Sequence, residues 1–244
     1  MRARPSLLPQ AARLFAAQAR LYCISALIPG LLGIISLTAI SIVMLRGAGE
    51  GTLALWEAVS FWRKFIAIVG VTLSLWTPIL LAARSACRIT ANQLSGQPVA
   101  LRITLADMAK FLPAALVYSF LIGFPTMIGA AMLLLPGIVI AAVFALIVPT
   151  SVNERASLPE TYSRGISLAW KVFPKALIIT TVCAALVLLV RMMVDRLLPD
   201  TRILFAFKFT LAYIPALLLL VLANICYSLL YLEAHAKFRH SPAA

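Results

Sequence analysis

The sequence predicts an all-α polytopic membrane protein with six transmembrane helices arranged as three hairpins. Hydrophobic residues make up 63% of the 244 residues and charged residues only 12%, with a mean hydropathy of +1.01. Soluble domains carry about 25% charged residues, so a soluble fold of this length could not bury so much apolar surface. The apolar runs are continuous rather than alternating, which favours helices over the strands of a membrane barrel.

The stretch 111–153 predicts the central hairpin. It contains no charged side chain and is long enough for two crossings of about 20 residues each. Pro136 and Gly137 lie inside it, and this pair is typical of a tight turn because proline fixes one dihedral and glycine accepts positive φ. Lys110 and Glu154, which flank the stretch, are therefore expected on the same side of the membrane.

The remaining apolar runs predict two more hairpins in one integral membrane domain, residues 1–244. The expected spans are 21–45, 65–83, 111–132, 137–153, 174–194 and 209–232. External connections are expected at 46–64, with an interfacial segment at 53–62, and at 191–208. In the first span, Gly30 and Gly33 form a small-residue stripe that would let a neighbouring helix approach closely.

A short amphipathic segment precedes each hairpin. Apolar residues recur three to four positions apart in 11–20, 99–110 and 158–173, which is typical of helices lying in a membrane interface. All three segments fall on the side of the N-terminus, so each hairpin is expected to have a cytoplasmic interfacial lead-in. The last residues, 233–244, form a basic cytoplasmic tail expected to be disordered.

The charge distribution predicts the orientation. Fourteen of the 21 lysines and arginines fall in the segments on the side of the two termini, which places both termini in the cytoplasm. The net charge of +13 raises nucleic acid as a partner, but the chain has no compact basic domain to bind it. We expect these residues to contact anionic lipid instead, with a membrane or cytoplasmic protein as a further possible partner.

Few side chains point to chemistry. No charge lies at the centre of a predicted span, and Asn224 is the polar side chain most worth following inside one, with interhelical hydrogen bonding as its default role. The four cysteines lack metal-ligand spacing, and His235 and His240 fall in the tail. We therefore expect no catalytic, metal or cofactor site.

The segment 134–168 carries a recognisable pattern, formed by Pro136-Gly137, Pro149, Glu154 and the run from Glu160 to Arg164. This pattern resembles a superfamily of six-helix bacterial inner-membrane proteins. The superfamily includes YciC-like proteins and the membrane domain attached to some glycerophosphodiester phosphodiesterases. The resemblance implies fold and location in the bacterial inner membrane but no reaction, and the catalytic phosphodiesterase domain is absent from this chain.

Two features qualify or support that pattern. The sequence departs from it at Thr161 and Gly165, where the family pattern has alanine and serine. Glu160 falls in the first turn of a predicted helix, where a carboxylate is favoured, and Arg164 four residues later is placed to pair with it.

Two functions remain open. The first is a non-enzymatic scaffold, regulatory or assembly component of the inner membrane, indicated by the absence of buried charge and by the basic lead-in segments. The alternative is a transporter or permease component for a small or lipidic substrate, indicated by spans interrupted at Pro29, Pro125, Pro149 and Pro215. A lipid-active enzyme lacks candidate residues.

Overall fold

The computed structural model describes residues 7–45, 61–132, 134–154, 156–197 and 202–239, and the descriptions below concern these residues. They form helices and short connections, without a strand among them. The elements are α1 (Leu7–Ala17), α2 (Ala19–Leu45), α4 (Phe61–Leu94), α5 (Leu101–Tyr118), the π-helical η1 (Ser119–Gly123), α6 (Phe124–Met132), α7 (Leu134–Phe144), α8 (Ile147–Asn153), α9 (Leu158–Lys171), α10 (Phe173–Leu197) and α11 (Arg202–Arg239).

Six helical stretches in the described chain are long and apolar enough to cross a membrane, which confirms the prediction of an all-helical fold with six helices of this kind. These stretches are Ala19–Ala39, Ile68–Leu94, Leu101–Ala130, Leu134–Asn153, Phe173–Leu197 and Leu211–Ala236. Their order and number agree with the six predicted spans.

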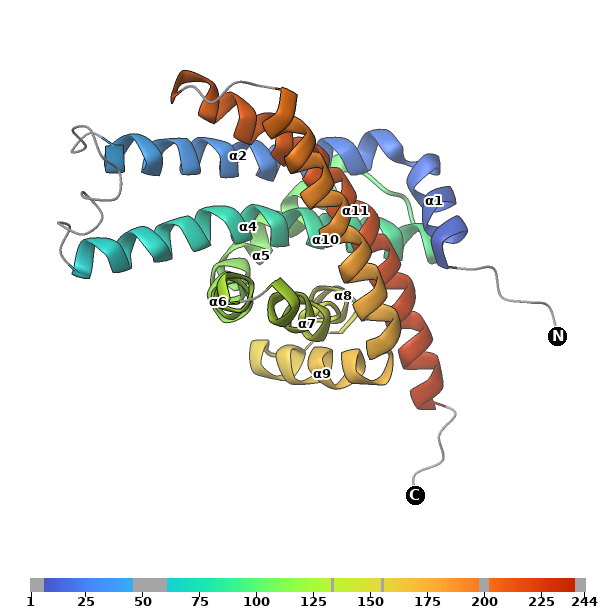
Figure 1. The fold of residues 1–244 in the computed structure, drawn as a ribbon. Helices are drawn as coiled ribbons and strands as arrows, with labels where there is room; N and C mark the ends of the chain where they lie inside the picture. Colours follow the sequence, from blue (N-terminus) through green and yellow to red (C-terminus); the bar gives the residue numbers. More distant parts are fainter. Residues whose placement is uncertain (1–6, 46–60, 133, 155, 198–201, 240–244) are drawn as a thin grey trace.

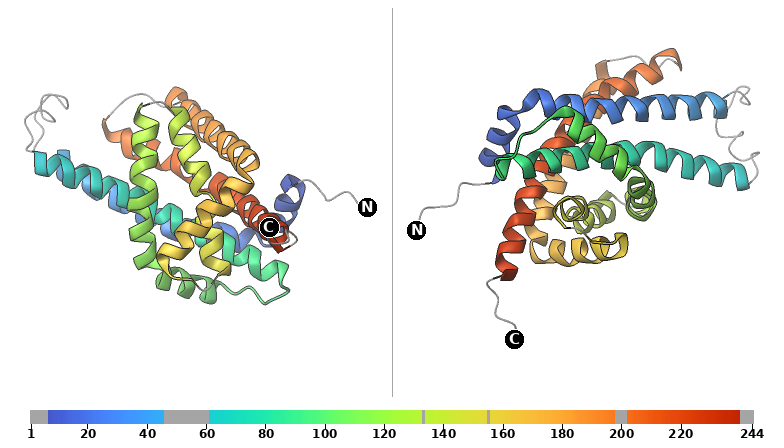
Figure 2. Two further views of the ribbon diagram at one scale, coloured as in Figure 1. Left: turned by 90° about the horizontal axis from the view of Figure 1, so that it is seen from below. Right: turned by 180° about the vertical axis from the view of Figure 1, so that it is seen from behind.

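Consecutive long elements pack in pairs, α2 on α4, α6 on α7 and α10 on α11. The three pairs diverge from a shared core instead of lying parallel to one another (Figures 1 and 2). Near this core lie α1, the connection between α4 and α5, α9 and the C-terminal part of α11 (Figure 1). We give the name hub to the region where α4, α5, α8, α9 and the C-terminal part of α11 meet.

The last helix, α11, is the central element of the fold. In its apolar window 61% of the residues are buried, whereas in the window of α10 only 6% are, so α10 lies at the outside of the described protein. Glycines allow α2 to approach the core closely. A Cβ at Gly30 would collide with the side chain of Leu217 of α11, and one at Gly33 would lie 2.8 Å from Pro78 of α4. The close approach expected at these two glycines is thereby confirmed.

Several helix boundaries differ from the prediction. The segment 99–110 is not a separate lead-in helix, because α5 begins at Leu101 and continues through η1 and α6 as one stretch. Similarly, α4 continues beyond the predicted span to Leu94 and ends before Gly96, which has a φ of +67°. The tail also begins later than expected, since α11 remains helical to Arg239.

The predicted turn at Pro136-Gly137 is wrong. Both residues lie in the first turn of α7, where proline is tolerated because its missing N–H would have no helical partner there. Gly137 serves packing instead, since a Cβ there would lie 2.8 Å from the backbone nitrogen of Ala130 on α6. The predicted fourth span is broken, with α7 ending at Phe144 and α8 beginning at Ile147.

Other predictions fall partly outside the described residues. The external connection 46–64 and its interfacial segment lie mostly there, as do 198–201 and the tail residues 240–244. At the second external connection, α10 extends to Leu197 and α11 begins at Arg202, so helices cover most of 191–208.

Candidate functional site

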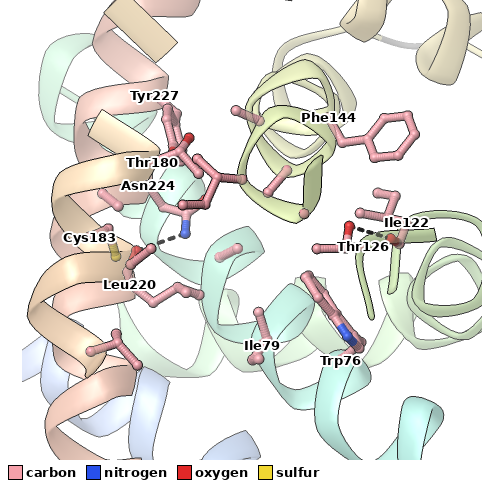
Figure 3. Close-up of a pocket in the computed structure, with 18 of the residues that line it drawn as sticks. Trp76, Ile79, Ile122, Thr126, Phe144, Thr180, Cys183, Leu220, Asn224 and Tyr227 are labelled. Carbon is pink, nitrogen blue, oxygen red and sulfur yellow. Dashed lines mark hydrogen bonds between the residues drawn. The ribbon is translucent and has the colours of Figure 1, made fainter. Parts of the chain in front are cut away.

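A crevice of about 440 Å³ opens between the diverging pairs and is the main candidate site (Figure 3). Its walls come from α4, from the stretch η1–α6, from α7 with α8, and from α10 and α11. Gly137, part of the predicted signature, lies in its wall. The volume falls within the roughly 300–1,000 Å³ range of small-molecule sites, which are mostly apolar with a few polar groups.

The described residues that line the crevice include no charged side chain. Its polar members are Trp76, Thr126, Thr180, Asn224 and Tyr227. Figure 3 places the last three together on the α10–α11 wall, while Thr126 and Ile122 lie on the facing side. An ion in the crevice would be buried without a partner, which is costly. The uncharged wall therefore disfavours an ion.

Most of the polar hydrogens in the crevice are already used. The Thr126 hydroxyl donates to the carbonyl oxygen of Ile122 at 2.6 Å, within its own helix. The Thr180 hydroxyl donates to the carbonyl oxygen of Ala176 at 2.8 Å. Thr180 Oγ1 therefore accepts in its 2.7 Å contact with the hydroxyl of Tyr227, which is the donor there.

Asn224, the polar residue singled out in the sequence, lies in this wall and is 6% exposed. Its Nδ2 donates one hydrogen to the carbonyl oxygen of Leu220 at 2.8 Å. An amide has two N–H hydrogens and an oxygen acceptor, so this single bond leaves hydrogen-bonding capacity. The default role of interhelical hydrogen bonding does not describe this bond, which stays within α11.

Trp76 closes the crevice against the π-helical turn. Its indole lies over Gly123, where a Cβ would be 2.5 Å from Trp76 Cγ, so only glycine permits this contact. The Nε1 atom is sealed inside the protein, without a hydrogen-bond partner among the described residues. π-Helical turns are frequent at functional sites, and η1 contributes Ile122 to the crevice.

Beside the crevice, at the hub, an ion pair joins α4 to α5. Arg84 Nε donates to Asp107 Oδ2 at 2.8 Å, and the two side chains are 13% and 21% exposed. The same guanidinium donates through Nη1 to the carbonyl oxygen of Ser151 on α8 at 2.7 Å and lies 4.7 Å from the centroid of the Phe111 ring. These contacts fix α4, α5 and α8 relative to one another.

A second polar cluster joins α8, α9 and α11 around Glu154. The Tyr231 hydroxyl donates to Glu154 Oε1 at 3.0 Å, and Arg164 Nη1 donates to Glu154 Oε2 at 2.9 Å. The hydrogen bond that Arg164 donates to Glu154 raises the pKa of the Arg164 guanidinium above its usual value. Arg164 thus binds Glu154, rather than forming the predicted ion pair with Glu160.

The remaining signature residues have structural roles. Glu160 accepts the backbone N–H of Ser157 at 3.1 Å, which caps α9, and this hydrogen bond lowers the pKa of the carboxyl. Pro149 is buried in α8, and Pro136 is exposed at the start of α7. At Gly165, a Cβ would lie 2.7 Å from the Cα of Ile147, so a glycine at this position lets α9 approach α8.

Sequence reasoning missed Arg84, Asp107 and Trp76. One signal was present, because Asp107 is the single acidic residue in 84–110 and Arg84 is the first charge after an apolar run. For Trp76 there was none, since its contact depends on how η1 crosses α4.

The cysteines and the other possible metal ligands of the described chain form neither a disulfide nor a metal site. The four cysteines are free thiols. No group of three His, Cys, Asp or Glu residues lies close enough to hold a metal ion within the described residues.

Comparison with known proteins returned no relative. No protein-family model, no curated protein and no solved structure matches the chain.

Proposed function

We propose that this protein is a non-enzymatic multi-pass protein of the bacterial inner membrane that binds one lipid-like molecule in the crevice. It would act as a transporter or permease component for a lipidic substrate. The observation that carries the proposal is the crevice itself, an uncharged space of about 440 Å³ bounded by helices of all three pairs. An apolar chain fits such walls, whereas an ion would find no partner there.

The proposal includes a topology. The three pairs would be transmembrane hairpins with the hub and both termini at the cytoplasmic face. In support, the hub contains Arg84, Lys110, Arg164 and Lys175, and cytoplasmic ends of spans are enriched in such residues. α1 and α9 would lie in the cytoplasmic interface against anionic lipid, with the exposed Trp170 at headgroup level.

Single-cysteine labelling tests the topology. All four native cysteines are replaced by alanine, and one cysteine is introduced in turn at Ser163 on α9 and at Gly49 in the first external connection. A membrane-impermeant maleimide applied to intact cells should label the second position and leave the first unlabelled until the cells are opened. The opposite labelling pattern would show that the protein has the reverse orientation.

A matched pair of variants tests the binding function. Ala184 and Val182 both lie on α10, but Ala184 lines the crevice whereas Val182 faces outward. Ala184→Phe should fill part of the crevice and lower the amount of co-purified lipid seen by native mass spectrometry. Val182→Phe adds bulk on the lipid-facing side and should leave that amount unchanged. Equal lipid retention in both variants would count against the proposal.

The scaffold function is a second candidate, favoured by the outer face of α10. This face exposes Ile178, Val182, Leu189 and Met193, and most of α10 has no cover within the described protein. A photo-crosslinking amino acid at Leu189 would capture a partner helix in native membranes if the protein is a scaffold. Capture of lipid alone would argue for the transporter function.

We also propose that the chain belongs to the six-helix superfamily that 134–168 resembles. In support, the pattern residues lie on three consecutive helices, α7, α8 and α9, or at the end of α8. A parallel six-helix bundle in a solved structure of a YciC-like protein would argue against membership.

A further inference from the structure

We propose that the crevice selects an uncharged amphiphile, a single apolar chain bearing one neutral hydrogen-bonding group that binds the side-chain amide of Asn224. This inference rests on the proposed function, because it names the class of molecule that the same crevice would bind. A long-chain alcohol, ester or ketone has this chemistry, whereas an ionised fatty acid does not.

Few polar groups in the crevice can still bind a ligand. The hydroxyl hydrogens of Thr126, Thr180 and Tyr227 are all donated within the protein. The indole N–H of Trp76 is fully buried, so a ligand in the crevice does not reach it. Among the described lining residues, the Cys183 thiol is a free but weak donor, so the second N–H of Asn224 is the strong side-chain donor left for a ligand, with Asn224 Oδ1 as an adjacent acceptor.

The described residues that line the crevice offer no counter-charge to an anionic ligand. Arg84 is the cation nearest along the chain to the crevice wall, and it is held by Asp107, Ser151 and Phe111 beside α5. It is not among the residues that line the crevice. A carboxylate or phosphate inside the crevice would thus be desolvated without a counter-charge, which costs far more than one hydrogen bond returns.

The position of Asn224 suits a ligand with one polar group and one apolar chain. Asn224 lies on the α10–α11 wall, facing the apolar side chains of the opposite wall (Figure 3). A neutral polar group can hydrogen-bond there while the attached chain lies along α4, α7 and α10. A pure hydrocarbon could enter the same space but would leave the amide unpaired.

Three photoreactive probes with the same chain test the inference. Hexadecane, hexadecanol and hexadecanoate, each with a mid-chain diazirine, are titrated onto the full chain in phosphatidylcholine nanodiscs at alkaline pH. Labelling of peptides from α7 and α10 is measured by mass spectrometry. Hexadecanol should reach half-saturation at a concentration about three- to tenfold lower than hexadecane, in line with one hydrogen bond in a membrane protein. Hexadecanoate should not saturate these peptides.

Two variants assign the effect to Asn224. Asn224→Leu should bring the half-saturating concentration of hexadecanol up to that of hexadecane. Thr104→Val on α5 removes a hydroxyl that lies outside the crevice lining and donates to the carbonyl oxygen of Ala100, so it should leave both values unchanged. The ranking of the probes on the unaltered protein provides a test that does not depend on either variant folding.

The outcomes separate the two proposals. Equal affinity for hexadecanol and hexadecane, or saturation by hexadecanoate, would overturn the selectivity for an uncharged polar group and leave the lipid-binding function standing. If none of the three probes labels the crevice peptides in a saturable way, the proposed function itself fails, and this inference fails with it.

Discussion

Removal of the carboxylate that holds Arg84 should cost much more stability than removal of an exposed one. Asp107→Asn leaves Arg84, whose side chain is only 13% exposed, without its counter-charge. Breaking a buried pair by removing one partner costs about 3–5 kcal/mol. We expect the lower end, about 3 kcal/mol, because Asp107 is itself 21% exposed and Arg84 keeps its hydrogen bond to Ser151.

The chain offers a matched control in the pair Arg191–Asp195. This pair also has an N–O distance of 2.8 Å, but both side chains are more than 40% exposed and lie one turn apart on α10. Asp195→Asn should therefore cost only about 0.3–0.5 kcal/mol.

Unfolding of the purified protein by SDS in mixed micelles, followed by circular dichroism, measures both variants. A further variant, Arg84→Met with Asp107→Leu, should recover much of the lost stability, because an apolar pair needs no desolvation of charge. Equal losses in Asp107→Asn and Asp195→Asn would refute the conclusion that the hub pair is structurally important.

Three further predictions concern packing, a hydrogen bond and pH. Gly137→Leu should destabilise the protein by about 1–3 kcal/mol in the same SDS assay, because its side chain would meet the backbone of Ala130; a smaller loss would mean that α6 and α7 separate easily. Tyr231→Phe should cost about 0.5–1.5 kcal/mol through loss of the hydrogen bond to Glu154, and an unchanged midpoint would show that water replaces it. The pKa of Glu160 is lower in the folded protein than the usual glutamate value of 4.5. The ionised carboxylate therefore stabilises α9 fully above pH 4.5, and this stabilisation is lost as the pH falls through the lowered pKa. Amide hydrogen exchange in α9 should show this loss at acid pH, and Glu160→Gln should remove the pH dependence.

Hydropathy located the spans but not the ends of the helices. The residues after Ala83 are polar enough to end an apolar run, yet α4 continues to Leu94, because no glycine or proline interrupts it before Gly96. Its polar residues are also buried in the core, where Thr90 lies 2.8 Å from the hydroxyl of Tyr22. A scale that scores each residue by its own polarity cannot anticipate that a neighbouring helix supplies the hydrogen bond.

The site was predictable only in part. Asn224 is visible in the sequence as a polar residue in an apolar run, and the structure places it in the crevice wall. The crevice itself depends on the angles at which the pairs diverge. Those angles depend on contacts between elements, such as Trp76 of α4 over Gly123 of η1, which join residues far apart in the chain. Local patterns of hydropathy carry no information about such contacts.

The hub and the crevice are held by different forces, and this difference separates stability from binding. Asp107 and Glu154 join neighbouring pairs at the hub through charged hydrogen bonds. The crevice walls are almost wholly apolar, and in lipid apolar contacts between helices have little hydrophobic driving force. Asp107→Asn should therefore lower the SDS midpoint without changing the ranking of hexadecanol over hexadecane. Asn224→Leu should abolish that ranking without lowering the SDS midpoint. If each variant changed both measurements, the hub would control the shape of the crevice directly, and the two regions would have to be treated as one site.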